Sequence, residues 1–173
     1  MLSRANQYRQ KLENRMRRSC ILHVDDDPDD RLLLRHAAKQ AGVSLPLLSL
    51  EKGEQAVAYL SGQEEYGNRA EFPLPCVILL DIKMNGVSGF DVLKWIRDRS
   101  EFDDVVVIMF SGSRLDGDIQ KALALRANSF VAKPTGCEAL IKFMGAVQDY
   151  WLTFHEFGSD SNCRTRKAKL LPA

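Results

Sequence analysis

The stretch ILHVDDDPDD, Ile21–Asp30, joins a run of apolar residues to a cluster of carboxylates. Five Asp stand within six residues around one Pro. The apolar half is typical of a buried strand. Carboxylates at contact distance repel one another, so the polar half indicates either a bound cation or a role on the surface.

The same stretch predicts the start of a helix. Asp27 is a typical N-cap residue, and Pro28 suits the first helical position. Apolar residues then recur at helical spacing until Gly42, so we expect a helix over 28–41. The last two Asp of the stretch would lie in its first turn, where the helix dipole favours negative charge.

Apolar runs alternate with helical patterns along the rest of the chain. Strands are expected at 20–24, 44–50, 76–81, 105–110 and 128–133. Helices are expected at 28–41, 53–60, 89–99, 115–126 and 137–157. Ser88 and Asp91 form a capping-box start for the third helix, and Pro46 favours an edge position for the second strand. The order predicts an α/β fold, a (βα)5 doubly wound parallel sheet of the flavodoxin-like kind with strand order 2-1-3-4-5.

The two ends of the chain are basic. Residues 1–18 hold six Lys/Arg and one Glu, and residues 158–173 hold four Lys/Arg and one Asp, although the whole chain has a net charge of only +1. We expect a solvated extension and a solvated tail around one domain at 19–157, with contact to phosphates or a membrane surface as the alternative. Met16 fits a translation start as well as Met1 does.

Composition is that of an ordinary globular domain, with 45% hydrophobic and 27% charged residues. The four Cys are scattered, which favours free thiols in a reducing compartment. No apolar run approaches the length of a membrane span, so a cytoplasmic protein is expected. The polar segment 61–75 is expected to be a surface insertion before the third strand.

Polar residues end four of the expected strands. Asp25 and Asp26 follow the first, Asp81 the third, Ser111 the fourth and Lys133 the fifth. In such sheets, ligands bind in a crevice outside the carboxyl ends of the strands, where a divalent cation such as Mg²⁺ would relieve the repulsion between carboxylates. Asp81 could accept a phosphoryl group there, since a metal, an ammonium and a hydroxyl neutralise the charge of such a transfer.

This set of motifs resembles the receiver domain of the response regulators of two-component signalling. The similar segments are VDDDP (24–28), LDIKMNGVSG (80–89), MFSGS (109–113) and FVAKP (130–134). The spacings of 30 positions from Asp81 to Ser111 and 22 from Ser111 to Lys133 also match that family. The resemblance covers about residues 19–157.

The resemblance implies a role for each residue of the crevice. Asp81 would be the phosphoacceptor, and the implied Mg²⁺ ligands are Asp26, Asp25 through water, Asp81, and the backbone carbonyl of Lys83. Ser111 would be the switch hydroxyl. Two further implied features are Lys133 as the site lysine, before a cis peptide to Pro134, and Phe130 as the switch aromatic.

Two residues depart from the family pattern. Asn85 stands where the family often has Pro, which predicts a softer loop after Asp81. Lys83 stands where a neutral residue is common. A positive charge at that position could attract the phosphate group, or it could hinder the water that would hydrolyse the phosphorylated Asp81.

The insertion and the aromatic end of the last helix, GAVQDYWLTF (145–154), resemble the single-domain regulators paired with bacterial and cyanobacterial phytochromes. This implies a sensor histidine kinase, such as a phytochrome, or a phosphotransfer protein as partner, with slow autodephosphorylation and signalling in trans. Too few residues follow the last helix for a DNA-binding domain, so no direct DNA binding is expected. A homodimer is expected through the face of the fourth helix, fifth strand and fifth helix. The apolar residues proposed for it are Phe143, Val147, Tyr150, Trp151 and Phe154.

Two enzyme-like or cofactor-binding alternatives share parts of the pattern. A phosphatase of the haloacid-dehalogenase type would use Asp25 as nucleophile in a D-x-D motif, but it leaves Asp81 unexplained and usually needs a cap domain. A flavin-binding domain would need a Gly- and hydroxyl-rich phosphate loop after the first strand, where this chain has carboxylates.

Overall fold

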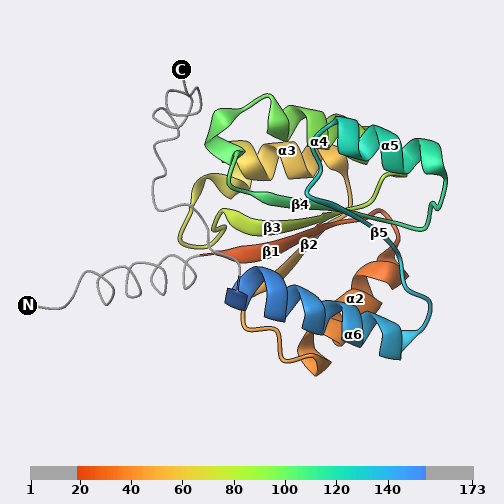
Figure 1. Cartoon of the computed structure of the whole chain (residues 1–173). Helices are drawn as coiled ribbons and strands as arrows, with labels where there is room; N and C mark the ends of the chain where they lie inside the picture. The colour runs from red at the N-terminus through yellow and green to blue at the C-terminus, as the bar shows by residue number, and fades with distance from the viewer. Residues whose placement is uncertain (1–18, 155–173) are drawn as a thin grey trace, which may run out of the picture.

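A computed structural model describes residues 19–154, which form a parallel sheet covered by helices on both faces (Figure 1). The strand order is β2-β1-β3-β4-β5, as predicted, and all four pairings are parallel. The strands are β1 (Cys20–Val24), β2 (Leu47–Leu50), β3 (Pro75–Leu80), β4 (Val106–Ser111) and β5 (Ser129–Ala132).

Helices cover both faces of the sheet, in two groups that pack against different cores (Figure 1). The first group contains α3 (Gly53–Ser61), α4 (Gly89–Arg97) and α5 (Asp116–Ala124). The second group contains α2 (Pro28–Gln40) and α6 (Cys137–Val147). Each face has its own hydrophobic core, because successive residues of a strand point to opposite faces. In β1, for example, Leu22 lies in the core under α3–α5 and Ile21 in the core under α2 and α6.

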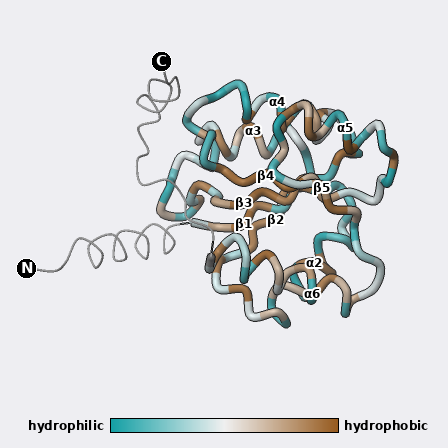
Figure 2. Tube along the Cα trace, in the orientation of Figure 1, coloured by the Kyte–Doolittle hydropathy of each residue, from teal (hydrophilic) through white to brown (hydrophobic). Residues whose placement is uncertain are grey.

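The continuous apolar runs are explained by burial on both faces. Every residue of β1 and β4 is buried, and the three central strands form the most hydrophobic part of the trace (Figure 2). The edge strands β2 and β5 are only half-buried throughout. Pro46 directly precedes β2, which confirms the predicted edge position.

The predicted helix starts are confirmed in detail. Asp27 Oδ1 accepts hydrogen bonds from the backbone N–H groups of Asp29 (2.8 Å) and Asp30 (3.4 Å), so it caps α2. The Ser88 side chain and Asp91 form the capping box of α4. These caps fix where each helix begins relative to the preceding strand.

The segment 61–75 is mostly exposed and lies between α3 and β3, as the expected surface insertion would, but it also has an ordered structure of its own. It contains a short 3₁₀ helix, Glu64–Gly67, and Tyr66 is buried against the rings of Tyr59 and Phe72. The Arg69 guanidinium donates to the carbonyls of Tyr59 and Leu60, each at 2.8 Å. Aromatic packing and these bonds attach the segment to α3.

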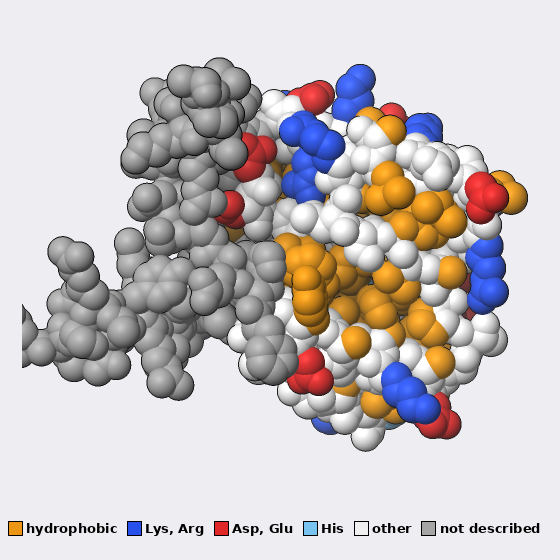
Figure 3. Space-filling model, viewed as in Figure 1, with side chains coloured by type: hydrophobic (Ala, Val, Ile, Leu, Met, Phe, Trp, Pro, Cys, Tyr) orange, Lys and Arg blue, Asp and Glu red, His pale blue; other side chains and the backbone are white. Residues whose placement is uncertain are grey.

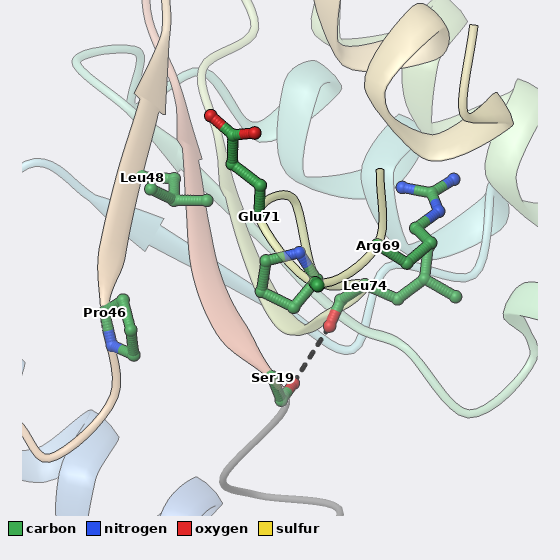
Figure 4. A pocket seen from close by; sticks show the side chains of 8 residues that line it. Ser19, Pro46, Leu48, Arg69, Glu71 and Leu74 are labelled. Atoms are coloured by element: carbon green, nitrogen blue, oxygen red, sulfur yellow. Dashed lines mark hydrogen bonds between the residues drawn. The ribbon is translucent and has the colours of Figure 1, made fainter. Parts of the chain in front are cut away.

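The same segment lines a cavity of about 730 Å³ at the amino ends of the strands (Figure 4). Ser19 lies at one end of this cavity and donates a hydrogen bond of 3.0 Å to the Leu74 carbonyl. Pro46 and Glu71 also line it. This cavity lies at the amino ends of the strands, whereas the crevice predicted from the sequence lies at their carboxyl ends. The cavity is therefore a separate feature, formed where the segment 61–75 meets the sheet.

Two expectations for the carboxyl-terminal part need correction. The helix expected over 137–157 ends as α6 at Val147 and continues as a π-helical segment, Gln148–Phe154. All peptide bonds between residues 19 and 154 are trans, including the bond before Pro134, for which the family resemblance implied cis. Residues 1–18 and 155–173, including both basic ends, lie outside the described residues, so the domain boundaries stay predictions. Among the described helices, none has the length and apolar character needed to cross a membrane.

The close approach of α4 to β3 gives a test of the fold. A Cβ on Gly89 would lie 1.9 Å from the Asp81 carbonyl oxygen, so Gly89→Ala should lower the free energy of unfolding by about 1–3 kcal/mol. Gly145→Ala in α6 is the matched control, because its Cβ would meet open space, and it should stabilise by about 0.5–1 kcal/mol. Urea unfolding measures both, and equal stability of the two variants would contradict the packing described.

Candidate functional site

The polar residues that follow the strands meet at the carboxyl edge of the sheet. Asp25 follows β1 and Asp81 follows β3, while Ser111 ends β4 and Lys133 follows β5. Adjacent strands are hydrogen-bonded beyond their formal ends: the Asp81 N–H donates to the Val24 carbonyl at 2.9 Å. Asp25, Asp81 and Ser111 are all buried, with exposed fractions of 0%, 6% and 1%. The sheet therefore brings together the side chains that the sequence placed at successive strand ends.

The Lys133 ammonium is the positively charged side chain in contact with the carboxylates of this site. Its Nζ lies 2.7 Å from Asp25 Oδ2, 2.7 Å from Asp30 Oδ2 and 3.3 Å from Asp81 Oδ2. One positive charge thus faces three carboxylates from two strand ends and the first turn of α2. The contact with Asp30 was not predicted, because the sequence assigned that residue only to the helix terminus.

The electrostatics of the site follow from these contacts. Burial raises the pKa of Asp25, but hydrogen bonding to His23 and Lys133 and the charge of Lys133 outweigh it, so the pKa lies below its usual range. Burial lowers the pKa of Lys133, but its hydrogen bonds to Asp25 and Asp30 and the charge of Asp81 outweigh it, so the pKa lies above its usual range. Both groups are therefore charged at neutral pH.

Asp26 is held by the loop between β3 and α4. Its Oδ2 accepts hydrogen bonds from the backbone N–H of Asn85 (3.1 Å) and from the Asn85 side-chain amide (3.0 Å). The same loop is tied to α3, because Glu54 accepts from the Val87 N–H at 3.1 Å. A proline at position 85 would supply neither donor, so this departure from the family pattern anchors the loop, contrary to the softer loop that was predicted.

The acidic residues form a set of oxygen donors that fits a divalent cation. One carboxylate oxygen from each of Asp25, Asp26 and Asp81 lies within 4.8 Å of the other two. Oxygen-only ligation of this kind suits a hard cation such as Mg²⁺ or Mn²⁺. Lys83 lies two residues after Asp81 in the loop before α4 with its side chain exposed, and the role of its carbonyl stays a prediction.

The two predicted switch residues lie on β4 and β5. Ser111 is buried at the end of β4, and its Oγ accepts a hydrogen bond of 3.4 Å from the Ser113 N–H. Phe130 is half-buried in β5 and packs against the core under α3–α5. In the register of β4 and β5, Phe130 pairs with Met109, two residues before Ser111. An aromatic side chain of an edge strand thus lies near the end of the neighbouring strand that carries Ser111.

The sequence analysis missed three residues of the site: His23, Asp30 and Asn85. His23 is buried in β1, with Nε2 3.2 Å from Asp25 Oδ2. A His in an otherwise aliphatic strand, two residues before a predicted ligand, was a usable signal, because residues i and i+2 of a strand share a face. The contacts of Asp30, in the first turn of α2, and of Asn85, in the loop before α4, join segments far apart in the sequence, and no local pattern indicates them.

Comparisons with known proteins agree with this geometry. The model of the family described as "Response regulator receiver domain" matches residues 21–144. The chain belongs to this family. Its fold is therefore the receiver fold, and the resemblance to response-regulator receiver domains that the sequence indicated is confirmed.

Several regulators linked to phytochromes are similar to this chain. Response regulator Rcp1 of Synechocystis is 28% identical over 132 residues, which is 76% of this chain and 88% of Rcp1. The crystal structure of the phosphorylated cyanobacterial phytochrome response regulator RcpA matches with a TM-score of 0.74 and 26% identity, covering 82% of this chain and 99% of RcpA. The Mn²⁺-bound form of Rcp1 matches with a TM-score of 0.72 and 26% identity, over 82% and 99% of the two chains.

The different positions of Asp26 and Asp27 give a test of the cation site. Asp26→Ala should weaken Mg²⁺ binding roughly tenfold or more, because it removes one of the three convergent carboxylates. Asp27→Ala is the matched control: it should leave Mg²⁺ affinity within about twofold and lower the free energy of unfolding by about 1 kcal/mol through loss of the cap. Calorimetric titration and urea unfolding measure the two effects. Equal loss of Mg²⁺ affinity in both variants would contradict the assignment of Asp26 to the cation site and of Asp27 to the helix cap.

Proposed function

We propose that this protein is a single-domain response regulator that accepts a phosphoryl group on Asp81 from a phosphohistidine. The observation that supports this best is the position of Asp81. It is a carboxylate with Oδ2 3.3 Å from an ammonium, next to two more carboxylates that can hold a cation. Phosphoryl transfer depends mostly on positioning and on neutralising charge, and this site offers both.

In the proposed reaction, a carboxylate oxygen of Asp81 attacks the phosphorus of the phosphohistidine. The P–N bond breaks, its electron pair returns to the imidazole nitrogen, and an acyl phosphate forms on Asp81. Mg²⁺, bound by Asp25, Asp26 and the Lys83 carbonyl together with Asp81, would neutralise charge on the phosphoryl oxygens. Lys133 would neutralise further charge on the phosphoryl group, and its contacts with Asp25 and Asp30 keep it in place. Slow hydrolysis by water then returns Asp81 and releases inorganic phosphate.

The proposed output is a population shift that involves Ser111 and Phe130. The Ser111 hydroxyl, which accepts only a weak bond from Ser113, could turn to donate to a phosphate oxygen. That movement would free space for Phe130 to turn inward. Phosphorylation would thereby change the surface made by α5, β5 and α6.

The phosphatase alternative with Asp25 as nucleophile is less well supported. Asp25 is completely buried and its Oδ2 is already in contact with His23 and Lys133, which leaves no open approach for a phosphate ester. The membership of the receiver family also argues for a signalling role rather than turnover of a phosphate monoester.

The proposed partner is a sensor histidine kinase or a phosphotransfer protein, and similarity to Rcp1 and RcpA favours a phytochrome. A groove of about 390 Å³ between α2 and α6 borders Lys133 and is lined by apolar residues that include Leu33 and Leu140. It offers a helix of the partner an apolar contact beside the site. We further expect a cytoplasmic location, where such kinases present their phosphohistidine.

The proposed homodimer uses the face of α5, β5 and α6. Within residues 19–154, β5 is an edge strand that pairs with β4 alone, and hydrophobic side chains gather between α5 and α6 where it runs (Figure 3). Of the apolar residues proposed for this face, Val147 is buried in the core and Phe143 stacks on Phe110 at 4.7 Å. Tyr150, which is 59% exposed, and Trp151 beside it remain candidates for the surface, and the side chain of Phe154 lies outside what the structure describes.

The first test of the proposed function is chemical labelling. Acetyl phosphate should label the wild-type protein only when Mg²⁺ is present, and Asp81→Asn should abolish the label because it removes the nucleophile and keeps the shape. Asp27→Asn is the control, since Asp27 is exposed and serves α2. Intact-mass spectrometry measures the added phosphoryl group. Labelling of Asp81→Asn to the wild-type extent would show that another residue is the acceptor.

The second test concerns self-association. Beryllofluoride, as a phosphate mimic on Asp81, should tighten a dimer in sedimentation experiments, and Tyr150→Glu should weaken it by placing like charges in the interface. Leu32→Glu is the matched control, because Leu32 is 63% exposed on α2, away from the proposed face. A monomer at tens of micromolar with and without beryllofluoride would contradict the dimer.

A further inference from the structure

Buried polar atoms without a hydrogen-bond partner are concentrated at one place in the described residues. Within 19–154, four buried side-chain atoms lack a well-aligned hydrogen bond: His23 Nδ1, His23 Nε2, Asp25 Oδ2 and Ser49 Oγ. Two of these atoms, His23 Nε2 and Asp25 Oδ2, nevertheless face each other at 3.2 Å, and Asp25 Oδ2 also contacts Lys133 Nζ at 2.7 Å. A buried polar group that lacks a partner costs about 1–3 kcal/mol, so each case needs an explanation. That all four belong to three neighbouring residues indicates a functional arrangement more than scattered packing defects.

The three residues form a row that leads to the site. Ser49 of β2 pairs with His23 of β1 in the strand register, so their side chains lie side by side on one face. Asp25 follows two residues later on the same face, with its Oδ2 3.2 Å from His23 Nε2 and 2.7 Å from Lys133 Nζ. The row therefore runs from the edge strand β2, through the core, to the ammonium of the site.

The surroundings of His23 make it a poor packing residue. Its side chain is completely buried in the core under α2 and α6, with the ring of Phe110 at 6.2 Å in an edge-on arrangement. An aliphatic side chain at that position would bury apolar surface without leaving polar atoms unpaired. The imidazole therefore stabilises the fold less than an aliphatic side chain would at this position.

We propose that His23 is a positioning residue for Asp25, whose Oδ2 it holds through a proton on Nε2. A neutral imidazole carries one N–H, and the bond made by one nitrogen decides which nitrogen bears the proton. With Nε2–H directed at Asp25, the carboxylate stays oriented between Lys133 and the cation. This inference rests on the proposed cation site, but not on phosphoryl transfer.

Groups that orient a metal ligand typically change metal affinity 10- to 100-fold when they are removed. His23→Leu should therefore raise the dissociation constant for Mg²⁺ about tenfold, yet unfold at an equal or higher urea concentration than wild type. His23→Gln, which can donate an N–H from nearly the same place, should return the Mg²⁺ affinity to within about threefold of wild type. A merely structural role would lower stability and affinity together and would give no recovery with Gln.

Leu79→Val is the control for core packing. Leu79 pairs with His23 across β1 and β3 and is also completely buried, so this variant should lower the urea midpoint and leave Mg²⁺ affinity within about twofold.

Calorimetric titration of the metal-free protein with Mg²⁺ measures these affinities without any phosphodonor. If the wild type binds Mg²⁺ and His23→Leu binds it equally well, the positioning role is overturned and the proposed function stands. If the wild type itself does not bind Mg²⁺, both the positioning role of His23 and the proposed function are overturned. Nitrogen-15 spectra of the imidazole give an independent readout: a proton on Nε2 is expected, and a bare Nε2 would overturn the proposal.

Discussion

The contact of one ammonium with three carboxylates is the constraint on which the rest of the site depends. Lys133 Nζ lies within 3.3 Å of oxygens from Asp25, Asp30 and Asp81, two of which are buried. Without a cation, these carboxylates would repel one another, and the burial of Asp25 and Asp81 limits how far water can screen that repulsion. Lys133 supplies part of the compensating charge, and the acidic donor set leaves room for a divalent cation to supply the rest.

The strand order and the helix starts place Lys133 beside the three carboxylates. A parallel sheet with the order β2-β1-β3-β4-β5 puts the ends of β1 and β3 next to each other and brings the end of β5 to the same edge, beyond β4. The Asp27 cap then starts α2 so that Asp30 turns toward Lys133, and the lack of a side chain on Gly89 lets α4 begin against the Asp81 carbonyl. The β3–α4 loop is fixed by carboxylates from two other elements, Asp26 and Glu54. Helix starts and loop contacts therefore place the charges as much as the strands do.

The elements and the strand-end residues could be predicted because their signals are local. The apolar runs, the Asp27 cap and the Ser88–Asp91 capping box each depend on neighbours in the sequence, and all are confirmed. The residues that were missed depend on contacts between distant segments. Tyr66 and Arg69 are held by α3, Asn85 by Asp26, and the end of α6 at Val147 follows no residue signal that was recognised. His23 could have been found, since its burial in β1 and its alignment with Asp25 follow from strand periodicity.

The central claim, that Asp81 is the phosphoacceptor of a cation-dependent site, is tested most directly by locating the acyl phosphate. Borohydride reduces an acyl phosphate to an alcohol, so a phosphorylated Asp becomes homoserine, which peptide mass spectrometry can map. After treatment with acetyl phosphate and Mg²⁺, homoserine is expected at position 81, and after the same treatment with a chelator it is expected nowhere. Homoserine at position 25, the nucleophile of the phosphatase alternative, or elsewhere in the cluster 25–30 would contradict the account.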